Sequence, residues 1–225
     1  SVNGKETSIT DFAGQKNWRI ENVALTEGEN TFEFWGKDKN GNKSAHVKME
    51  DVMVDFAKPV VSLTYKVDGG EATSSVPSYI ADGAVLTVNG TVTESNGVKA
   101  VNVTAKKGGT EVTSGSNGYS VVTNPESKTF TITLTGGNES SGEWSFDVEA
   151  VDKAGRKSSV SNVKTSVDMT PPQWLTSWGT NGENKFKVDN KEYAEENWYS
   201  GAALSFNGCF LETGSGVDQI YYLVI

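Results

Sequence analysis

Apolar and polar residues alternate along most of this chain, and no window shows the 3.6-residue spacing of an amphipathic helix. The alternating runs are short and are separated by turns rich in Gly, Asn and Ser, such as residues 114–118. Because successive side chains of a strand point to opposite faces, each run predicts a strand with one buried face. The middle of the chain contains seven such runs, at residues 60–66, 84–94, 98–106, 119–123, 128–134, 143–152 and 159–168.

The apolar positions of these runs also predict a core. Leu86, Val101, Phe130 and Phe146 come from four different runs and are expected to share one interior. About seven short alternating strands in roughly 110 residues are typical of the immunoglobulin-like (Ig-like) sandwich, in which two sheets pack over a common core. The antibody signature of two cysteines around a tryptophan is absent, because Cys209 is the single cysteine. We therefore expect an all-β fold of tandem immunoglobulin-like β-sandwich domains.

Two blocks of the sequence recur about 115 residues later. Residues 32–44 match residues 146–158 and share Phe, Asp-Lys, Gly and Lys-Ser at the same positions. Residues 83–94 match residues 201–212 at a similar offset, and both blocks end in Glu. A period of this length is too long for a solenoid repeat and fits whole sandwich domains that follow one another along the chain.

Proline-containing segments mark the boundaries between the copies, because proline cannot continue a paired strand. They lie at residues 54–59 and 167–172. We expect one complete domain at 59–168, with the C-terminal half of a domain at 1–58 and the N-terminal half of another at 169–225. Half a sandwich cannot bury its own inner face, so we expect a segment of a longer protein. Alternatively, the two halves complement each other between molecules and form a head-to-tail polymer.

The turn at residues 150–158 and the junction at 167–172 resemble those of bacterial Ig-like repeats of large surface and secreted proteins. Units of that family often carry an Asp-x-Ala-Gly-Asn-x-Ser turn and an Asp-Thr-Thr-Pro-Pro junction. Its Ser-Gly-Val turn resembles residues 96–98 and 215–217. The resemblance implies a multidomain protein located outside the cell, either at the cell surface or secreted. Arg156 stands where the family usually has Asn, which argues against a metal ion at that turn.

Charge and composition exclude several functions. The formal net charge of −9 argues against a nucleic-acid partner, because phosphate binding depends on clustered Lys and Arg. No apolar stretch approaches the roughly 18 residues that a membrane-spanning helix needs. His46 and Cys209 are the single residues of their kinds, they fall in different partial domains, and no third residue orients them as a catalytic pair. We expect that the chain is not an enzyme.

The turn around Asp38 is the first candidate for a metal site. Asp38, Asn40 and Asn42 place oxygen-bearing side chains at alternate positions, and Ca²⁺ prefers oxygen ligands. Asp, Asn and Gly are also the ordinary residues of tight turns, so the same pattern is explained by backbone geometry alone. No cofactor is expected apart from such a structural calcium ion.

The junctions between domains are the second candidate for calcium. Glu50, Asp51 and Asp55 precede the first junction, and Asp168 precedes the second. Carboxylates beside a linker could bind Ca²⁺ and hold neighbouring domains in a fixed orientation. A Lys–Asn isopeptide bond inside a domain is a further option, but the sequence does not indicate which pair would form it.

Exposed aromatic residues would be needed for a carbohydrate site. Trp35 is predicted to face away from Phe32 and Phe34, and three further tryptophans, Trp174, Trp178 and Trp198, follow the complete domain. Core or interdomain packing is the more frequent role of such residues. Trp35 is therefore the single candidate for a glycan or protein ligand.

These observations predict a spacer. The expected function is that of a stalk or adhesin segment of a bacterial extracellular protein, or a unit of a fibre, surface layer or cell wall. Its expected partners are the neighbouring Ig-like domains and a host or cell-surface glycan or protein. The alternative is a glycan- or protein-binding accessory module of a secreted carbohydrate-active enzyme. Short junctions that contain Pro favour the first prediction, because they limit bending between domains.

Overall fold

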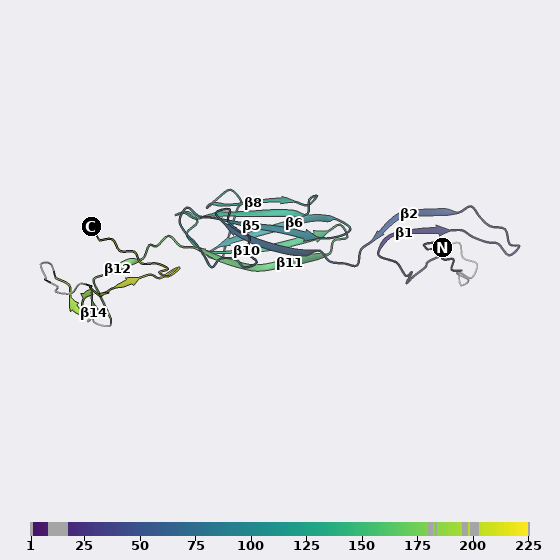
Figure 1. The fold of residues 1–225 in the computed structure, drawn as a ribbon. Coiled ribbons are helices and arrows are strands. Elements are labelled where there is room, and N and C mark those ends of the chain that lie inside the picture. The colour runs from purple at the N-terminus through teal and green to yellow at the C-terminus, as the bar shows by residue number, and fades with distance from the viewer. Residues whose placement is uncertain are drawn as a thin grey trace.

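The computed structural model describes residues 2–8, 18–179, 182, 184–194, 198 and 203–224. Its described part is all-β and contains no helix. Figure 1 shows a central body of long strands between two smaller parts, with β1 and β2 at one end and β12 and β14 at the other.

The central body consists of two sheets. Its strands are β3 (Val60–Val67), β4 (Tyr79–Ile80), β5 (Val85–Thr93), β6 (Val98–Lys107), β7 (Thr110–Val112), β8 (Tyr119–Asn124), β9 (Thr129–Thr135), β10 (Gly142–Asp152) and β11 (Lys157–Val167). One sheet has the order β3-β5-β9-β8 and the other the order β4-β11-β10-β6-β7. All neighbours are antiparallel except β4 and β11. The seven predicted strands are confirmed to within one or two residues at each end.

The core between the two sheets contains the residues that alternation predicts. Leu86, Val101, Phe130 and Phe146 belong to one buried cluster, and Leu86 and Phe146 are 0 % and 1 % exposed. Gly90 lies under the ring of Phe130, where an added Cβ would come within 1.9 Å of the ring. The strand therefore needs glycine at this position.

The N-terminal part is built on one hairpin. β1 (Gly28–Phe34) and β2 (Val47–Val54) pair antiparallel, with a bulge between Asn30 and Phe32. Asn30 is buried, and its side chain bonds to both the amide and the carbonyl of Thr26. Phe32 and Phe34 stack with their ring centroids 6.2 Å apart and are half-buried. Trp18 packs against Phe34, and among the described residues no second sheet of the central kind covers this hairpin.

The C-terminal part contains short strands. They are β12 (Gln173–Leu175), β13 (Ser177–Trp178), β14 (Asn184–Lys185), β15 (Lys187–Val188), β16 (Lys191–Glu192), β17 (Phe206–Asn207) and β18 (Cys209–Leu211). β12 pairs with β18, β13 with β14, and β15 lies between β16 and β17. Trp174 packs edge-on against Phe186 and Phe210 and lies over Gly208, whose added Cβ would be 2.4 Å from its ring.

Candidate functional site

Three carboxylates from separate segments converge where the N-terminal part meets the central sandwich. Asp55 follows β2, Glu94 follows β5, and Asp152 is the last residue of β10. One carboxylate oxygen of each residue lies within 4.8 Å of the other two. Glu94 is 5 % exposed and Asp152 is 0 % exposed, so the cluster is closed off from solvent on the sandwich side.

Each of these carboxylates uses one oxygen to close its own turn. Asp55 Oδ1 accepts the amide of Ala57 at 3.0 Å, and Glu94 Oε1 accepts the amide of Asn96 at 2.9 Å. In the same way, Asp152 Oδ1 accepts the amide of Arg156 at 2.8 Å. The turns therefore fix the direction in which each second oxygen points.

The second oxygens are buried and have no hydrogen-bond partner. They are Oδ2 of Asp55, Oε2 of Glu94 and Oδ2 of Asp152. Burying an unpaired carboxylate oxygen is costly, and bringing three anions together adds repulsion. A bound cation would remove both penalties, and an oxygen-only set of ligands suits a hard cation. The arrangement can therefore hold a metal ion.

Two turns of the central sandwich bring Glu94 and Asp152 together. The amide of Lys153 donates to the carbonyl of Gly97 at 3.1 Å, which ties the β10–β11 turn to the β5–β6 turn. The ammonium of Lys128 donates to the carbonyl oxygen of Glu94 and leaves its carboxylate free. The sandwich thus presents two of the three carboxylates on one rigid edge.

Side chains also join the N-terminal part directly to the sandwich. Arg156 Nε donates to the carbonyl oxygen of Asp55 at 2.7 Å. The carboxylate of Glu27 accepts the amide of Phe56 at 2.7 Å and the side-chain amide of Asn96 at 3.0 Å. These bonds hold the linker against the edge of the sandwich without any metal ion.

The second junction repeats this arrangement in part. Asp168 follows β11 and accepts the amide of Thr170 at 3.0 Å, as Asp55 accepts Ala57. Glu212 follows β18, accepts the amide of Gly214 at 2.7 Å and leaves Oε2 buried without a partner. In contrast to Asp55, Asp168 also accepts the amide of Ser215 through Oδ2 at 2.7 Å. The amides of Thr170 and Ser215 hold the pKa of Asp168 below its usual value.

The calcium ion predicted at the junctions stays a prediction, but the structure shows where its four acidic candidates lie. Asp55 belongs to the three-carboxylate cluster, and Asp168 occupies the matching place at the second junction. Glu50 and Asp51 are exposed on β2 and lie outside the cluster. Sequence reasoning did not single out Glu94 and Asp152, which complete the cluster. The repeat alignment carried the signal, because Glu94 matches Glu212 and Asp152 matches Asp38.

The Asp38 turn has the same backbone form as the turn at Asp152. Asp38 Oδ1 accepts the amides of Asn40 and Asn42 at 2.9 and 2.8 Å, and Oδ2 accepts the side-chain amide of Asn42. These bonds, above all the one from the Asn42 side chain, hold the pKa of Asp38 below its usual value. All three residues are exposed. The carboxylate closes its own turn, and the calcium ion predicted here stays a prediction.

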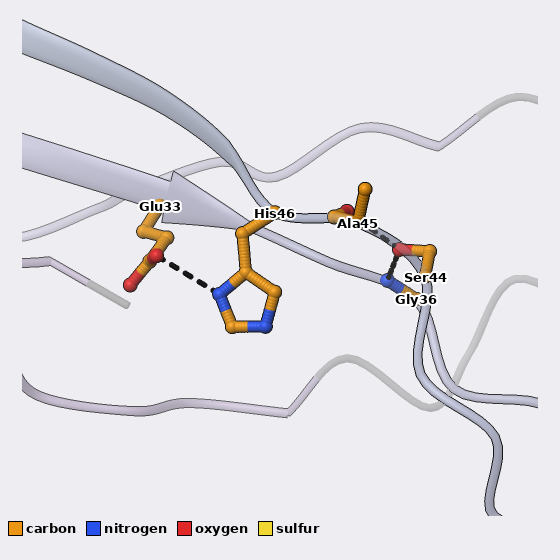
Figure 2. Close-up of polar contacts among 5 residues, drawn as sticks. All are labelled: Glu33, Gly36, Ser44, Ala45 and His46. Carbon is orange, nitrogen blue, oxygen red and sulfur yellow. Dashed lines mark hydrogen bonds and ion pairs between the residues drawn. The ribbon is translucent and has the colours of Figure 1, made fainter.

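Polar contacts between β1 and the segment before β2 surround His46. His46 Nδ1 lies 2.9 Å from Glu33 Oε1, and this hydrogen bond lowers the pKa of Glu33 (Figure 2). Ser44 Oγ accepts the amide of Gly36 at 2.9 Å and donates to the carbonyl of Ala45 at 2.9 Å (Figure 2). These contacts join the two arms of the loop.

Trp35 lies beside this network. Its ring stacks on the ring of His46 with centroids 4.7 Å apart, and Lys43 Nζ lies 5.8 Å from the centroid of the Trp35 ring. Trp35 is half-buried, because His46 covers one of its faces. In the repeat, Trp35 and Lys43 occupy the positions of Glu149 and Lys157, which form an ion pair. A glycan site at Trp35 stays a prediction.

The remaining sequence candidates are not brought together. His46 lies beside β2, and Cys209 lies in β18, which pairs with β12. Figure 1 shows β2 and β12 at opposite ends of the central sandwich. In the C-terminal part, Trp174 contacts phenylalanine rings, whereas Trp198 is exposed. The absence of an enzymatic activity stays a prediction.

Comparisons with known proteins do not assign the chain to a family. No protein-family model matches the chain, and no curated protein is significantly similar to it. Among the described residues, no helix is both long enough and apolar enough to cross a membrane.

Proposed function

We propose that this chain is part of an extracellular stalk in which Ig-like sandwiches follow one another at fixed spacing. The order of the central strands supports the Ig-like assignment. β3-β5-β9-β8 corresponds to the A-B-E-D sheet of an Ig domain, and β6 and β10-β11 correspond to its C and F-G strands. The parallel pairing of β4 with β11 adds a short strand at the edge of the second sheet.

Strand pairing supports the view that the two end parts are partial copies of the central sandwich. At one end, Phe32 pairs with Met49, and the equivalent residues Phe146 and Val163 pair in the central sandwich. At the other end, β12 and β18 pair in the register of β3 and β5, so that Gln173 opposite Leu211 repeats Val60 opposite Thr93. Matching pairing between aligned segments is expected for copies of one domain.

The observation that carries the proposal is the repeated junction. Five residues link β2 to β3, and five link β11 to β12. Each linker begins with an aspartate whose carboxylate accepts the backbone amide two residues later. At both junctions a second bond reaches across, from Arg156 to Asp55 and from Ser215 to Asp168. Short, tied linkers suit a spacer, because they restrict the angle between neighbours.

The proposed location and partners follow from this role. A stalk of this kind lies outside the cell and extends a terminal adhesive or catalytic part away from the surface. Its direct partners are the neighbouring sandwiches of the same protein. The net charge of −9 keeps such a rod solvated and limits association between rods.

The proposal is tested by measuring the orientation of two neighbouring parts in the full chain. Cys209→Ser removes the native thiol, and Met49→Cys with Val122→Cys adds one spin label to the N-terminal part and one to the central sandwich, both at exposed positions. Pulsed electron resonance should give a single narrow distance distribution. A broad distribution that covers several tens of ångströms would contradict a spacer with fixed junctions.

A further inference from the structure

We propose that Asp55, Glu94 and Asp152 form a Ca²⁺ site that locks the first junction. The binding claim rests on the cluster itself, whereas the locking claim also rests on the proposed spacer function. Two of the three side chains are more than nine-tenths buried. Each of the three has a buried oxygen without a partner, and one carboxylate oxygen of each lies within 4.8 Å of the others.

No side chain in the described part of the structure compensates this charge. The ion pairs of the described residues leave all three carboxylates out. Two cationic side chains beside the cluster bind backbone oxygens instead, because Arg156 Nε donates to Asp55 O and Lys128 Nζ donates to Glu94 O. A protein rarely buries three unpaired carboxylate oxygens side by side unless a ligand takes their place as partner.

The geometry favours calcium among the common ions. Ca²⁺ binds oxygen ligands at about 2.3–2.6 Å, so two ligands of one ion lie at most about 4.6–5.2 Å apart. The three oxygens of the cluster lie within 4.8 Å of one another and fit this limit. Zn²⁺ prefers Cys and His ligands, and Mg²⁺ requires near-octahedral geometry at shorter distances. Waters and backbone carbonyls would complete the six to eight ligands that Ca²⁺ takes.

The origin of the ligands gives the ion a mechanical role. Asp55 belongs to the linker that leaves β2, whereas Glu94 and Asp152 belong to the edge of the central sandwich. An ion bound to all three therefore cross-links the linker to the sandwich. Without it, three carboxylates repel one another across the same contact. The linker then retains the bond from Arg156 to the Asp55 carbonyl and the bond from the Phe56 amide to Glu27, which also accepts Asn96.

The same ligand types recur at matching places of the repeat. Asp168 and Glu212 stand at the second junction where Asp55 and Glu94 stand at the first, and Glu212 Oε2 is also buried without a partner. Asp38 takes the position of Asp152 and forms the same turn. Among the described residues, the cluster of three carboxylates lies at the first junction, whereas Asp168 and Glu212 are the matching residues at the second. We therefore expect one tight Ca²⁺ site within the described part of the chain.

The test is calcium titration of the full chain after removal of metal with EDTA, by calorimetry and by thermal unfolding. The unmodified chain should bind one Ca²⁺, and saturating Ca²⁺ should raise the melting temperature by about 4 °C or more, because only the folded junction binds the ion. Mg²⁺ at equal concentration should raise it less. Absence of binding at millimolar Ca²⁺ would overturn the proposal.

A matched pair of variants separates the site from an ordinary turn. Asp152→Asn should weaken Ca²⁺ binding by about tenfold or more. Mutating residues that only hydrogen-bond to a metal ligand already lowers metal affinity by about this factor, and Asp152 is proposed as a ligand itself. Asp38→Asn makes the same change in the same kind of turn outside the cluster and should leave binding unchanged. In EDTA, Asp152→Asn should melt no earlier than the unmodified chain, because it removes one of three repelling charges. Equal binding by the two variants would contradict the assignment.

The spin-label distances distinguish failure of the site from failure of the spacer. If Ca²⁺ binds and narrows the distribution between positions 49 and 122, the locking claim holds. If Ca²⁺ binds and the distribution is equally narrow in EDTA, the site is real but does not lock the junction. If the distribution is narrow and no Ca²⁺ binds, the spacer proposal holds and the calcium proposal is wrong.

Discussion

The β1–β2 hairpin and the β10–β11 hairpin are two copies of one sequence block in different surroundings. The register of the two strands is the same at the phenylalanine: Phe32 lies opposite Met49 in the first hairpin, and Phe146 lies opposite Val163 in the second. Phe146 is buried under the β3-β5-β9-β8 sheet, whereas Phe32 is half-buried and its neighbour Met49 is 53 % exposed. The comparison shows that pairing is set within the hairpin, while burial depends on the sheet opposite.

Equivalent positions of the two hairpins carry side-chain pairs of different chemistry. Lys157 Nζ pairs with Glu149 Oε1 at 3.1 Å, and the equivalent Lys43 lies over the ring of Trp35. In both copies a cation that follows the turn thus meets a partner that precedes it, much as cross-strand neighbours do, although Trp35 and Lys43 lie just outside β1 and β2. Trp35 is therefore explained as one half of a cross-strand pair.

The largest expected effect tests the difference in burial. Phe146→Ala should lower the free energy of unfolding by about 3–5 kcal/mol, because it leaves a cavity in the core. Phe32→Ala removes the same group from a half-covered face and should cost about 1 kcal/mol. Urea unfolding followed by circular dichroism measures both. Similar losses for the two variants would show that the N-terminal hairpin is covered as well as the central one.

The second prediction concerns the sheet that covers Phe146. Gly90→Ala should destabilise the central sandwich by about 1–3 kcal/mol, because the new methyl group overlaps the ring of Phe130. A neighbouring control is Gly137→Ala, where nothing lies within 4 Å of the added Cβ and the backbone is not left-handed. Thermal melting of both variants checks this. The account is contradicted if the Gly137 variant melts earlier than the Gly90 variant.

Sequence alone predicts the central sandwich well and the site only in part. Alternation identifies long strands such as β5 and β10, because one buried face repeats every second residue over nine to eleven positions. It misses β4 and β7, which have two and three residues and show no period. Asp55 is suggested by its place in the linker. Glu94 and Asp152 lie far from the linker in sequence, and only the folded sheets bring them to it.

The third prediction exchanges a residue between the two copies. Asn42 holds the position of Arg156 in the repeat, so Arg156→Asn keeps the turn amide that binds Asp152 and removes only the bond to the Asp55 carbonyl. We expect a loss of about 1 kcal/mol and a broader spin-label distance distribution at the first junction. The reciprocal variant Asn42→Arg should leave that distribution unchanged. An unchanged distribution for Arg156→Asn would contradict a directly tied junction.

The fourth prediction compares the two cross-strand pairs. Lys157→Ala and Lys43→Ala should each cost less than about 1 kcal/mol, because both lysines are exposed to solvent. Added salt should reduce the effect of the Lys157 variant more, since its partner is a full charge. Urea unfolding at two salt concentrations measures this. A loss of several kcal/mol for the Lys43 variant would assign Trp35 a larger structural role.

The smallest effect concerns acid titration. The pKa values of Glu33 and Glu149 are both lowered, by the hydrogen bonds with His46 and Lys157 respectively. A carboxyl group whose pKa is lower in the folded state stabilises the protein at pH values above its pKa in the unfolded state. This stabilisation is lost as the pH falls through the pKa of the folded state. NMR titration should give both midpoints below 4.5, the ordinary value. His46→Ala should raise the midpoint of Glu33 and leave that of Glu149 in place; a shift of both would contradict these local causes.

A crystal structure of the full chain grown with Ca²⁺ would show whether an ion binds between the linker and the central sandwich. The account predicts electron density for one ion at the first junction, with an oxygen each of Asp55, Glu94 and Asp152 at about 2.3–2.6 Å from it. Density for a water molecule alone, or carboxylates turned away from one another, would contradict it.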